Sequence, residues 1–547
     1  MLVSPSHSSV SEALPPFMKL SPEDNSLFWL DLFRSWRESY GFGCKSVFGK
    51  DIDLFGDCIE RNLSLDHPCL SWHEQGDLVS VSYSQVANEV EGLASRWLAN
   101  SIQEGESVCI ICDHPYRRLV SLLCAFRLGL IPLLINPTGP VVIQSTLDAN
   151  PQDHLHVEPS LLKWIPEALR SSVLDLTRDA RRAKEACRYS SSAVALRLPD
   201  PFSSDMSALV ELTAQDLFLR LIRDGHSILR LQKGSRMASY VDLQDSTSPF
   251  TELMALLCGA SLICLNGETP ESFIRHLMLE SLEVIGISPK MMQPLMEAQL
   301  NTPRTGVWER WFRSPLVSHR ILEWQNFTKQ LDLEGTPHAD LQWTASSAGI
   351  AFGSEWSTNL FDFDLYPAPG QSWYLGDVAA PLMPTKGSSG RYVTSLNAED
   401  KPIDNPTPFI LLAHENAHRF LGCYPTGRAG MAFPEELVYR CVELPLCWHT
   451  IIELPVANGS QFVLLAFMDP RSKSDLNKII QENGGEFALP DQIEIIPYVP
   501  KLNQKGEIDA EWAKRLYLRG EFERRSKIPV YKALSKVRML ALTEINV

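Results

Sequence analysis

Hydrophobic and polar residues between positions 80 and 137 follow two different spacings in turn. The first positions alternate between polar and apolar, which is typical of a half-buried strand, and Tyr83 is expected to end it. Ser84 is then expected to cap a helix whose apolar stripe extends from Val86 to Trp97. Three elements follow: an apolar strand at 108–112, a helix at about 117–128 and an apolar run at 130–137. Buried strands that alternate with helices indicate a parallel sheet covered on both faces.

The same pattern recurs along the chain. Residues 250–267 predict a helix and then a strand, and residues 270–299 predict a helix, a strand and a helix. Residues 26–40 carry apolar groups at helical spacing. By contrast, residues 365–410 are rich in proline, glycine and serine, which favours turns and short strands. From Pro434 onward the pattern predicts a small α+β unit that ends in a basic helix.

We therefore expect an α/β protein with three parts, because 547 residues are too many for one ordinary core. Residues 1–45 are expected to form an N-terminal leader and helix. Residues 46–427 are expected to form a large domain of helix-covered, mostly parallel sheets with a β-rich subdomain. Residues 428–547 are expected to form the small α+β domain.

Charge and hydropathy exclude several classes of protein. The chain is 44% hydrophobic and 21% charged, which is typical of a globular protein. Its net charge of -16, without a dense basic block, disfavours nonspecific binding to nucleic acid. The longest apolar run, 119–135, is short for a membrane span and contains Arg127. Because the N-terminus also lacks a secretory pattern, we expect a cytoplasmic protein with no membrane span and no nucleic-acid partner.

Twelve scattered cysteines are expected to be reduced thiols. Cys109 and Cys112 form a CxxC motif, but they lie in a continuous apolar run rather than at a turn or a helix start. We therefore interpret them as residues of a buried strand.

The stretch from Ser80 to Pro137 resembles the opening of the adenylate-forming enzymes, the superfamily of acyl-CoA synthetases, nonribosomal adenylation domains and luciferases. The likeness lies in VSYSQVANEVEGLASRWLAN and EGESVCIICDHPYRRLVSLLCAFRLGLIPLLINP. Near the other end, ELVYRCVELPLCWHTIIELP and LPDQIEIIPYVPKLN resemble the small lid domain of that superfamily. The resemblance implies a large domain that makes an acyl adenylate from ATP and a lid domain that closes on it.

In that superfamily a loop rich in glycine, serine and threonine binds the phosphates of ATP with the help of a lysine. Backbone N–H groups and one cation must approach the phosphate oxygens closely. The loop aligns with residues 199–211, which contain no glycine and have Ala208 at the lysine position. The segment also adds Asp200 and Asp205, whose negative charges oppose a triphosphate.

The superfamily's aromatic-Gly-x-Thr-Glu motif supplies an acid that helps to hold Mg²⁺. Here it aligns with WTASSAG, residues 343–349. Trp343 keeps the aromatic residue, but Ser346 and Ser347 replace the threonine and the glutamate. Hydroxyl groups are poor Mg²⁺ ligands compared with a carboxylate.

The ribose-binding aspartate of the superfamily is also replaced. If Gly427 and Arg428 are the hinge between the two domains, the aspartate falls on Ala413. If residues 426–428 are instead the ribose motif, its aspartate has become Arg428.

The lid lysine is the fourth altered element. In the stretch KLNQKGEIDAEW, Glu507 follows the glycine where the superfamily has its lysine, and Lys505 stands before the glycine. Lys505 is either a displaced catalytic lysine or one more relaxed position.

These four changes predict a diverged member with degenerate ATP motifs, for which ATP and Mg²⁺ are not expected as cofactors. It would transfer an acyl or aryl group from a coenzyme A thioester to a carrier-protein phosphopantetheine or another thiol, or act as a non-catalytic partner. The acyl pocket is expected where a helix begins at Phe250 and Thr251, with core packing as the alternative role of Phe250. The alternative function is an active ATP-dependent acyl-CoA ligase or adenylation enzyme with rearranged motifs.

A motif of another class lies in FILLAHENAHRFLG, whose apolar spacing is helical. His414 and His418 are one helical turn apart and Glu415 lies between them, the HExxH pattern of zinc hydrolases. There the histidines bind the metal and the glutamate activates water. We favour a hydrogen-bonded or solvated histidine pair, and a zinc hydrolase stays the second alternative.

Overall fold

The structure is a computed structural model. It describes residues 22–40, 43–74, 77–135, 137, 140–177, 186–199, 209–240, 248–264, 271–287, 289–301, 304–313, 321–344, 349–359, 366–368, 373–375, 378–380, 382–385, 392–395, 424–426, 430–432, 448–456, 459–468, 492–497, 500–502, 508 and 510–522.

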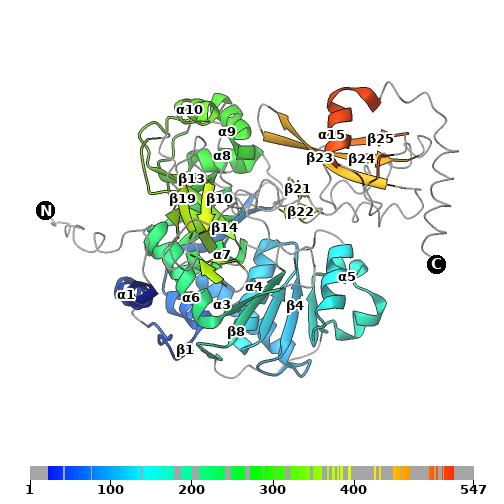
Figure 1. The fold of residues 1–547 in the computed structure, drawn as a ribbon. Helices are drawn as coiled ribbons and strands as arrows, with labels where there is room; N and C mark the ends of the chain where they lie inside the picture. The colour runs from blue at the N-terminus through cyan, green and yellow to red at the C-terminus, as the bar shows by residue number, and fades with distance from the viewer. Residues whose placement is uncertain are drawn as a thin grey trace.

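Two mostly parallel sheets form the large part of the chain (Figure 1). The order of the larger sheet is β16-β15-β14-β13-β12-β10-β11-β2-β3, and that of the smaller sheet is β6-β4-β5-β8-β9. Pairing is parallel from β14 to β2 and from β6 to β8, and antiparallel where β15, β16, β3 and β9 join. The predicted α/β class is therefore confirmed.

The strands of the larger sheet are β2 (Pro68–Glu74), β3 (Asp77–Ser82), β10 (Arg236–Tyr240), β11 (Ser261–Cys264), β12 (Leu282–Ile287), β13 (Trp308–Arg313), β14 (His338–Thr344), β15 (Gly349–Gly353) and β16 (Tyr366–Pro367). Those of the smaller sheet are β4 (Ser107–Ile111), β5 (Ile131–Leu134), β6 (His154–Val157), β8 (Val194–Pro199) and β9 (Leu209–Thr213). A separate pair consists of β1 (Asp51–Ile52) and β7 (Tyr189–Ser190).

The helices are α1 (Pro22–Tyr40), α2 (Leu54–Cys58), α3 (Tyr83–Leu98), α4 (Pro115–Leu128), α5 (Pro140–Ala149), α6 (Ala214–Ile222), α7 (Ser248–Leu257), α8 (Glu271–Leu279), α9 (Pro289–Asn301), α10 (Ile321–Gln330) and α15 (Ala510–Leu518). Shorter helical turns are η1 (Glu60–Asn62), η2 (Pro159–Trp164), η3 (Glu167–Ser172) and the π-helical η4 (Arg223–Ile228). None of the helices in the described part of the chain has both the length and the hydropathy that a membrane crossing requires.

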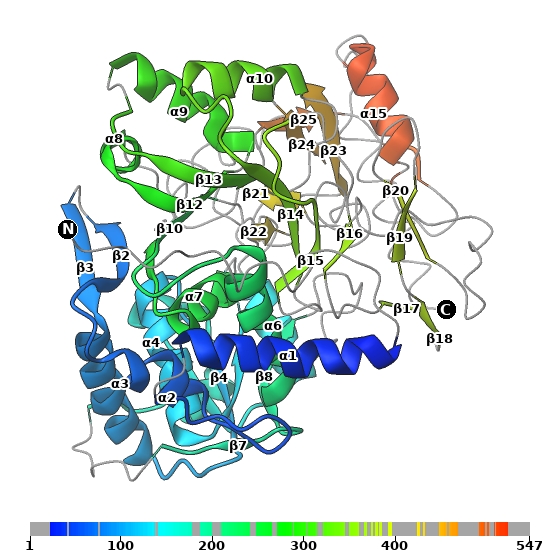
Figure 2. The same ribbon diagram turned by 90° about the vertical axis from the view of Figure 1, so that its left-hand side faces the viewer.

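Three apolar clusters arrange these elements in layers. The largest cluster joins the inner faces of both sheets through α3, α4, α6 and α7, so these helices form a middle layer. A second cluster packs α8, α9 and α10 on the outer face of the larger sheet (Figure 2), and a third packs α5 on the outer face of the smaller one. Each fully buried leucine or phenylalanine in such a layer contributes about 1.5–3 kcal/mol.

The start of α3 differs from the prediction. The predicted cap was Ser84, but the helix begins at Tyr83 and its cap is Ser82. The Gln85 amide donates to Ser82 Oγ at 3.3 Å, and the Ser82 amide donates to Gln85 Oε1 at 2.8 Å. The prediction was wrong because this reciprocal capping box needs a glutamine three residues after the cap.

The CxxC motif is buried at the end of β4: Cys109 lies in the strand, as predicted, and Cys112 directly follows its last residue. Cys109 and Cys112 are 0% and 1% exposed. Successive residues of a strand point to opposite faces, and Cys112 belongs to the middle-layer cluster whereas Cys109 belongs to the outer one. The two thiols therefore cannot act as a pair.

The C-terminal part contains the strands predicted from its pattern. β23 (Trp448–Val456), β24 (Gly459–Phe467) and β25 (Gln492–Ile496) form a three-stranded sheet whose apolar cluster includes residues of α15. The described residues of the Pro/Gly/Ser-rich stretch form the short strands β16, β17 (Trp373–Leu375), β18 (Val378–Ala380), β19 (Leu382–Thr385) and β20 (Tyr392–Ser395). They are followed by the pair β21 (Tyr424–Thr426) and β22 (Gly430–Ala432). The expected boundary between residues 427 and 428 lies outside the described residues.

Helix α1 confirms the helical spacing predicted for residues 26–40. Its buried residues Leu32 and Trp36 belong to the middle-layer cluster. Ser35 Oγ lies 3.0 Å from Nε2 of His226, a residue of η4 whose ring is edge-on to Tyr40. Burial lowers the pKa of His226 to about 4.

A buried ion pair fixes the start of β15. Arg223 and Asp224 are both 0% exposed, and Arg223 Nε donates to Asp224 Oδ1 at 2.7 Å. The pair also binds the backbone of Ile350: its N–H donates to Asp224 Oδ2 at 2.7 Å and its carbonyl accepts from Arg223 Nη2 at 2.6 Å. Gly349 has φ +145°, and a Cβ there would lie 2.0 Å from Asp224 Oδ2.

Gly349 should therefore tolerate no side chain. We expect Gly349→Ala to lower the free energy of unfolding by more than about 3 kcal/mol, since it combines backbone strain with displacement of a buried carboxylate. Gly335→Ala is the matched control, because Gly335 also has positive φ (+80°) but faces open space; it should cost only about 1–2 kcal/mol. Equal losses in urea unfolding would contradict this account.

Acid should destabilise the protein through His226. Its pKa is about 4 when folded and 6.5 ordinarily, so the unfolded chain binds more protons between these values and stability falls as pH drops through them. We expect the difference in unfolding free energy between pH 7 and pH 4.5 to shrink by about 2.5 kcal/mol in His226→Gln. An unchanged difference would show that the ring is already charged in the folded protein.

Candidate functional site

The candidate site lies where two parallel strands of the larger sheet end beside the first turns of two middle-layer helices. Trp72 of β2 and Cys264, the last residue of β11, are register partners. The Trp72 ring stacks on Tyr116 of α4 with centroids 4.7 Å apart, and Arg118 of α4 pairs with Glu252 of α7. Ligands of open parallel sheets commonly bind at this carboxyl edge.

The first turn of α4 is held by a carboxylate from the smaller sheet. Glu158 follows the end of β6, and its Oε2 accepts the backbone N–H groups of Asp113 at 3.0 Å and His114 at 3.2 Å. Its Oε1 accepts from Arg117 at 2.6 Å. Pro115 takes the first helical position, where a missing N–H costs nothing. The positive end of α4 is therefore already occupied by this protein's own anion.

Arg118 and Glu252 connect α4 to α7 inside the protein. Arg118 Nη2 donates to Glu252 Oε1 at 3.1 Å, and the side chains are 12% and 4% exposed. Burial raises the pKa of Glu252, and the neighbouring guanidinium opposes that rise. Burial also raises the pKa of the Cys264 thiol, and Glu252 adds to this effect. Cys264 is therefore a neutral thiol at pH 7 and a poor nucleophile.

Several buried polar atoms at this site have no hydrogen-bond partner among the described residues. They are Nδ1 of His114, the hydroxyl oxygens of Tyr116 and Thr251, and Oε2 of Glu252. Leaving such a group unsatisfied costs about 1–3 kcal/mol.

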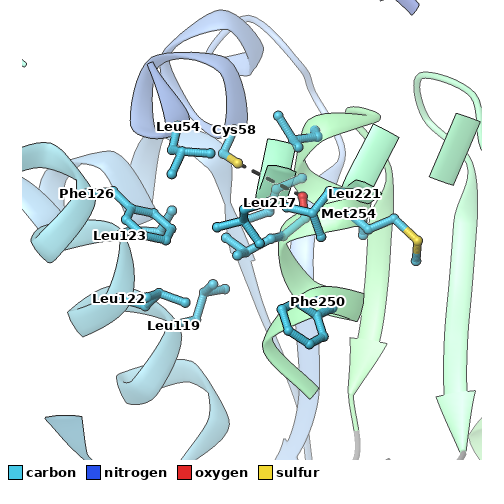
Figure 3. Packing of buried hydrophobic residues seen from close by; sticks show 14 of the residues in the cluster. Leu54, Cys58, Leu119, Leu122, Leu123, Phe126, Leu217, Leu221, Phe250 and Met254 are labelled. Atoms are coloured by element: carbon cyan, nitrogen blue, oxygen red, sulfur yellow. Dashed lines mark hydrogen bonds between the residues drawn. The ribbon is translucent and has the colours of Figure 1, made fainter. Parts of the chain in front are cut away.

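Phe250 and Thr251 do lie at the start of a helix, as predicted from the sequence. The Phe250 ring is 0% exposed and belongs to the middle-layer cluster with Leu119, Leu122 and Leu217 (Figure 3). This environment matches the core-packing alternative for Phe250. Thr251, with its unpartnered hydroxyl, is the polar residue of the two.

The segment aligned with the phosphate loop joins two paired strands. Pro199 at the end of β8 is opposite Leu209 at the start of β9, and residues 200–208 connect them. The predicted lysine position, Ala208, lies in this connection, outside the described residues. Thr213 then caps α6 by accepting the backbone N–H of Asp216 at 3.1 Å.

The segment aligned with the metal-binding motif follows β14. Trp343 is 1% exposed and packs in the middle-layer cluster, opposite Ile350 at a bulge. Ser346 and Ser347 lie outside the described residues. β14 is joined to β13 by a bidentate pair, in which Arg313 Nε and Nη2 donate to the two carboxylate oxygens of Asp340 at 2.5 and 2.7 Å.

The remaining predicted residues also lie outside the described part of the chain. They are Ala413, Gly427, Arg428, Lys505 and Glu507, and the zinc alternative His414, Glu415 and His418. An antiparallel bridge between Leu502 and Ile508 flanks the stretch with Lys505 and Glu507. Within the described residues, no group of three or more His, Cys, Asp or Glu side chains is placed to hold a metal ion.

The sequence analysis did not identify Arg118, Glu158 or Glu252. A usable signal was present for Glu252, which interrupts the apolar run from Phe250 to Leu257, whereas Arg118 stands beside Arg117 in front of its apolar run. A charged residue in such a run is almost never buried unless it is paired. Glu158 carried no comparable signal, since it follows a strand at an ordinary position for a polar residue.

No protein-family model and no curated protein matches this chain. Solved structures do. An o-succinylbenzoate CoA synthetase from Bacillus subtilis has a TM-score of 0.57 at 11% identity, over 85% of this chain and 98% of that one. An artificially fused adenylation–PCP di-domain from Klebsiella oxytoca has a TM-score of 0.57 at 12% identity, over 82% of this chain and 94% of that one. A fatty acyl-adenylate ligase from L. pneumophila, in complex with acyl adenylate and pyrophosphate, has a TM-score of 0.55 at 12% identity. The match covers 85% of this chain and 96% of that one. At these identities the likeness concerns the fold, and this chain has the fold of the adenylate-forming enzymes.

Proposed function

We propose that this protein handles an acyl or aryl group on the adenylate-forming fold without making an adenylate. It takes the group from a coenzyme A thioester and passes it to the phosphopantetheine thiol of a carrier protein or to another thiol. It works in the cytoplasm, in acyl or specialised metabolism. A non-catalytic partner that only binds the thioester is the limiting case of the same proposal.

The composition of residues 200–208 carries this proposal. The connection between β8 and β9 is where the phosphate loop is expected, yet it contains no glycine, no lysine and two aspartates, Asp200 and Asp205. Two unit charges 4 Å apart interact by about 4 kcal/mol at an effective dielectric constant of 20. Carboxylates at that position oppose a triphosphate instead of binding it.

The other aligned positions support the same conclusion. Ser346 and Ser347 offer no carboxylate for Mg²⁺, Ala413 or Arg428 replaces the ribose acid, and Glu507 stands at the lid-lysine position. Loss of four separate contacts to one ligand is better explained by loss of the ligand than by four local rearrangements.

Acyl transfer between thioesters needs none of these groups. The acceptor sulfur forms a new bond to the carbonyl carbon, the bond to the coenzyme A sulfur breaks, and the acceptor's proton passes to the departing thiolate. The two thioesters have similar energies, so positioning and polarisation of the carbonyl can supply the catalysis. The adenylation–PCP fusion with the same fold supports a carrier protein as the acceptor.

Nucleotide binding is the first test. We expect ATP with Mg²⁺ to leave the melting temperature unchanged, whereas a ligand at 100 times its Kd stabilises a protein by about 2.7 kcal/mol. We also expect no pyrophosphate release with a panel of carboxylic acids. Robust release that is abolished by Lys505→Ala but not by the control Lys501→Ala would instead establish the alternative, a rearranged ATP-dependent ligase.

Thioester exchange is the second test. Purified protein is incubated with acyl-CoA and aroyl-CoA thioesters and a holo carrier protein, and acylation of the carrier is followed by mass spectrometry. We expect transfer above the uncatalysed rate without ATP and no increase when ATP is added. Dependence on ATP would contradict the proposal, and so would the absence of both transfer and thioester binding.

A further inference from the structure

We propose that Ser35 of α1 is a nucleophile with His226 of η4 as its base, and that its hydroxyl takes one acyl group from an activated ester or thioester. This inference is independent of the proposed function, because it uses neither the carboxyl edge of the larger sheet nor the connection between β8 and β9. The product is a protein that carries an ester on α1.

Ser35 lies where the buried and exposed faces of α1 meet. The helix contacts α6 and η4 along the surface of the large part of the chain (Figure 2). Leu32 and Trp36 are fully buried, whereas Ser35 and His226 are both half-buried, so a small molecule in solution can reach them. Ser35 Oγ is 3.0 Å from Nε2 of His226, which is within the range for a hydroxyl nucleophile and its base.

Tyr40 determines which nitrogen of the His226 ring carries the proton. The Tyr40 hydroxyl donates to the backbone carbonyl of Leu231. Burial raises the pKa of Tyr40, so this hydroxyl keeps its proton at pH 7. Its oxygen lies 3.4 Å from His226 Nδ1 and acts there as an acceptor. The ring proton is therefore on Nδ1, and the lone pair of Nε2 accepts from the Ser35 hydroxyl.

The His226 ring is neutral and held in position. Burial lowers its pKa to about 4, so the lone pair of Nε2 is free at pH 7. The ring is edge-on to Tyr40, with centroids 5.3 Å apart and an interplanar angle of 82°, which restricts its rotation. A hydroxyl, a base and a third group that orients the base form the arrangement of serine nucleophiles. Because the low pKa also makes Nε2 a weaker base than an ordinary imidazole, we expect slow acylation by strongly activated donors.

The reaction needs no reactant besides the acyl donor. Ser35 Oγ forms a bond to the carbonyl carbon of the donor, and the bond from that carbon to the leaving oxygen or sulfur breaks. The hydroxyl proton passes from Oγ to His226 Nε2 and then to the departing phenolate or thiolate.

The experiment measures covalent acetylation of the full chain. The protein is incubated with p-nitrophenyl acetate or, separately, with acetyl-CoA, and the modified residue is identified by peptide mass spectrometry over time. We expect acetylation of Ser35 with at least one of the two donors, and the two arms show whether an ester or a thioester is the better source. His226→Gln should slow acetylation of Ser35 at least about tenfold, because it removes the base.

Two further variants separate reactivity from folding. Ser35→Ala should fold, because alanine is the best helix former, and should lose the acetyl group found at this position. Ser39→Ala is the matched control, since Ser39 is an exposed serine one turn further along α1. Acetylation of Ser35 in this control should proceed at the wild-type rate.

Each contrary result would overturn the inference. An unmodified Ser35 with both donors contradicts it, and so does acetylation of Ser35 at an equal rate in wild type and His226→Gln. Acetylation of Ser39 as fast as Ser35 would show that exposure, not His226, controls the reaction. All three results leave the proposed function in place, because transfer to a carrier protein does not pass through Ser35. Loss of carrier acylation, in turn, would leave the acetylation of Ser35 as predicted.

Discussion

Burial of one helical layer between two sheets is the constraint on which the rest of this structure depends. Each sheet has an apolar inner face that water would otherwise cover, and α3, α4, α6 and α7 cover both faces at once. A cluster of this kind contains many side chains that each contribute about 1.5–3 kcal/mol. Since these helices pack on both sheets, their positions are determined jointly. The first turns of α4 and α7 consequently meet at the carboxyl edge of the larger sheet.

Buried ion pairs in this apolar core hold particular strands in place, although burying their charges costs free energy. Burying an ion pair is often no better for stability than an apolar pair of the same size, but removal of one partner costs about 3–5 kcal/mol. Arg223 with Asp224 fixes the start of β15, and Arg313 with Asp340 joins β13 to β14. In both, every carboxylate oxygen has a partner. Glu252 differs because its second oxygen has none among the described residues.

Periodicity predicted the sheets because their strands are apolar over their whole length. The run at 108–112 overlaps β4 and the run at 130–137 contains β5. Local chemistry was harder to predict. Ser82 and Ser84 are equally good caps by residue type, and only the glutamine at position 85 decides between them. Arg118 and Glu252 are 134 positions apart in the sequence. No local sequence pattern can predict their pairing, because it depends on the packing of α4 against α7 in the middle layer.

The charges before α4 and in the connection between β8 and β9 bear on whether this protein binds a nucleotide. Glu158 already accepts the backbone N–H groups of Asp113 and His114 just before α4, so these two groups are not available to a phosphate. In the alignment proposed with the phosphate loop, the connection from Pro199 to Leu209 contains two aspartates and no lysine or arginine. These charges are the physical basis of our proposal that the protein does not carry out the nucleotide half of an adenylation reaction.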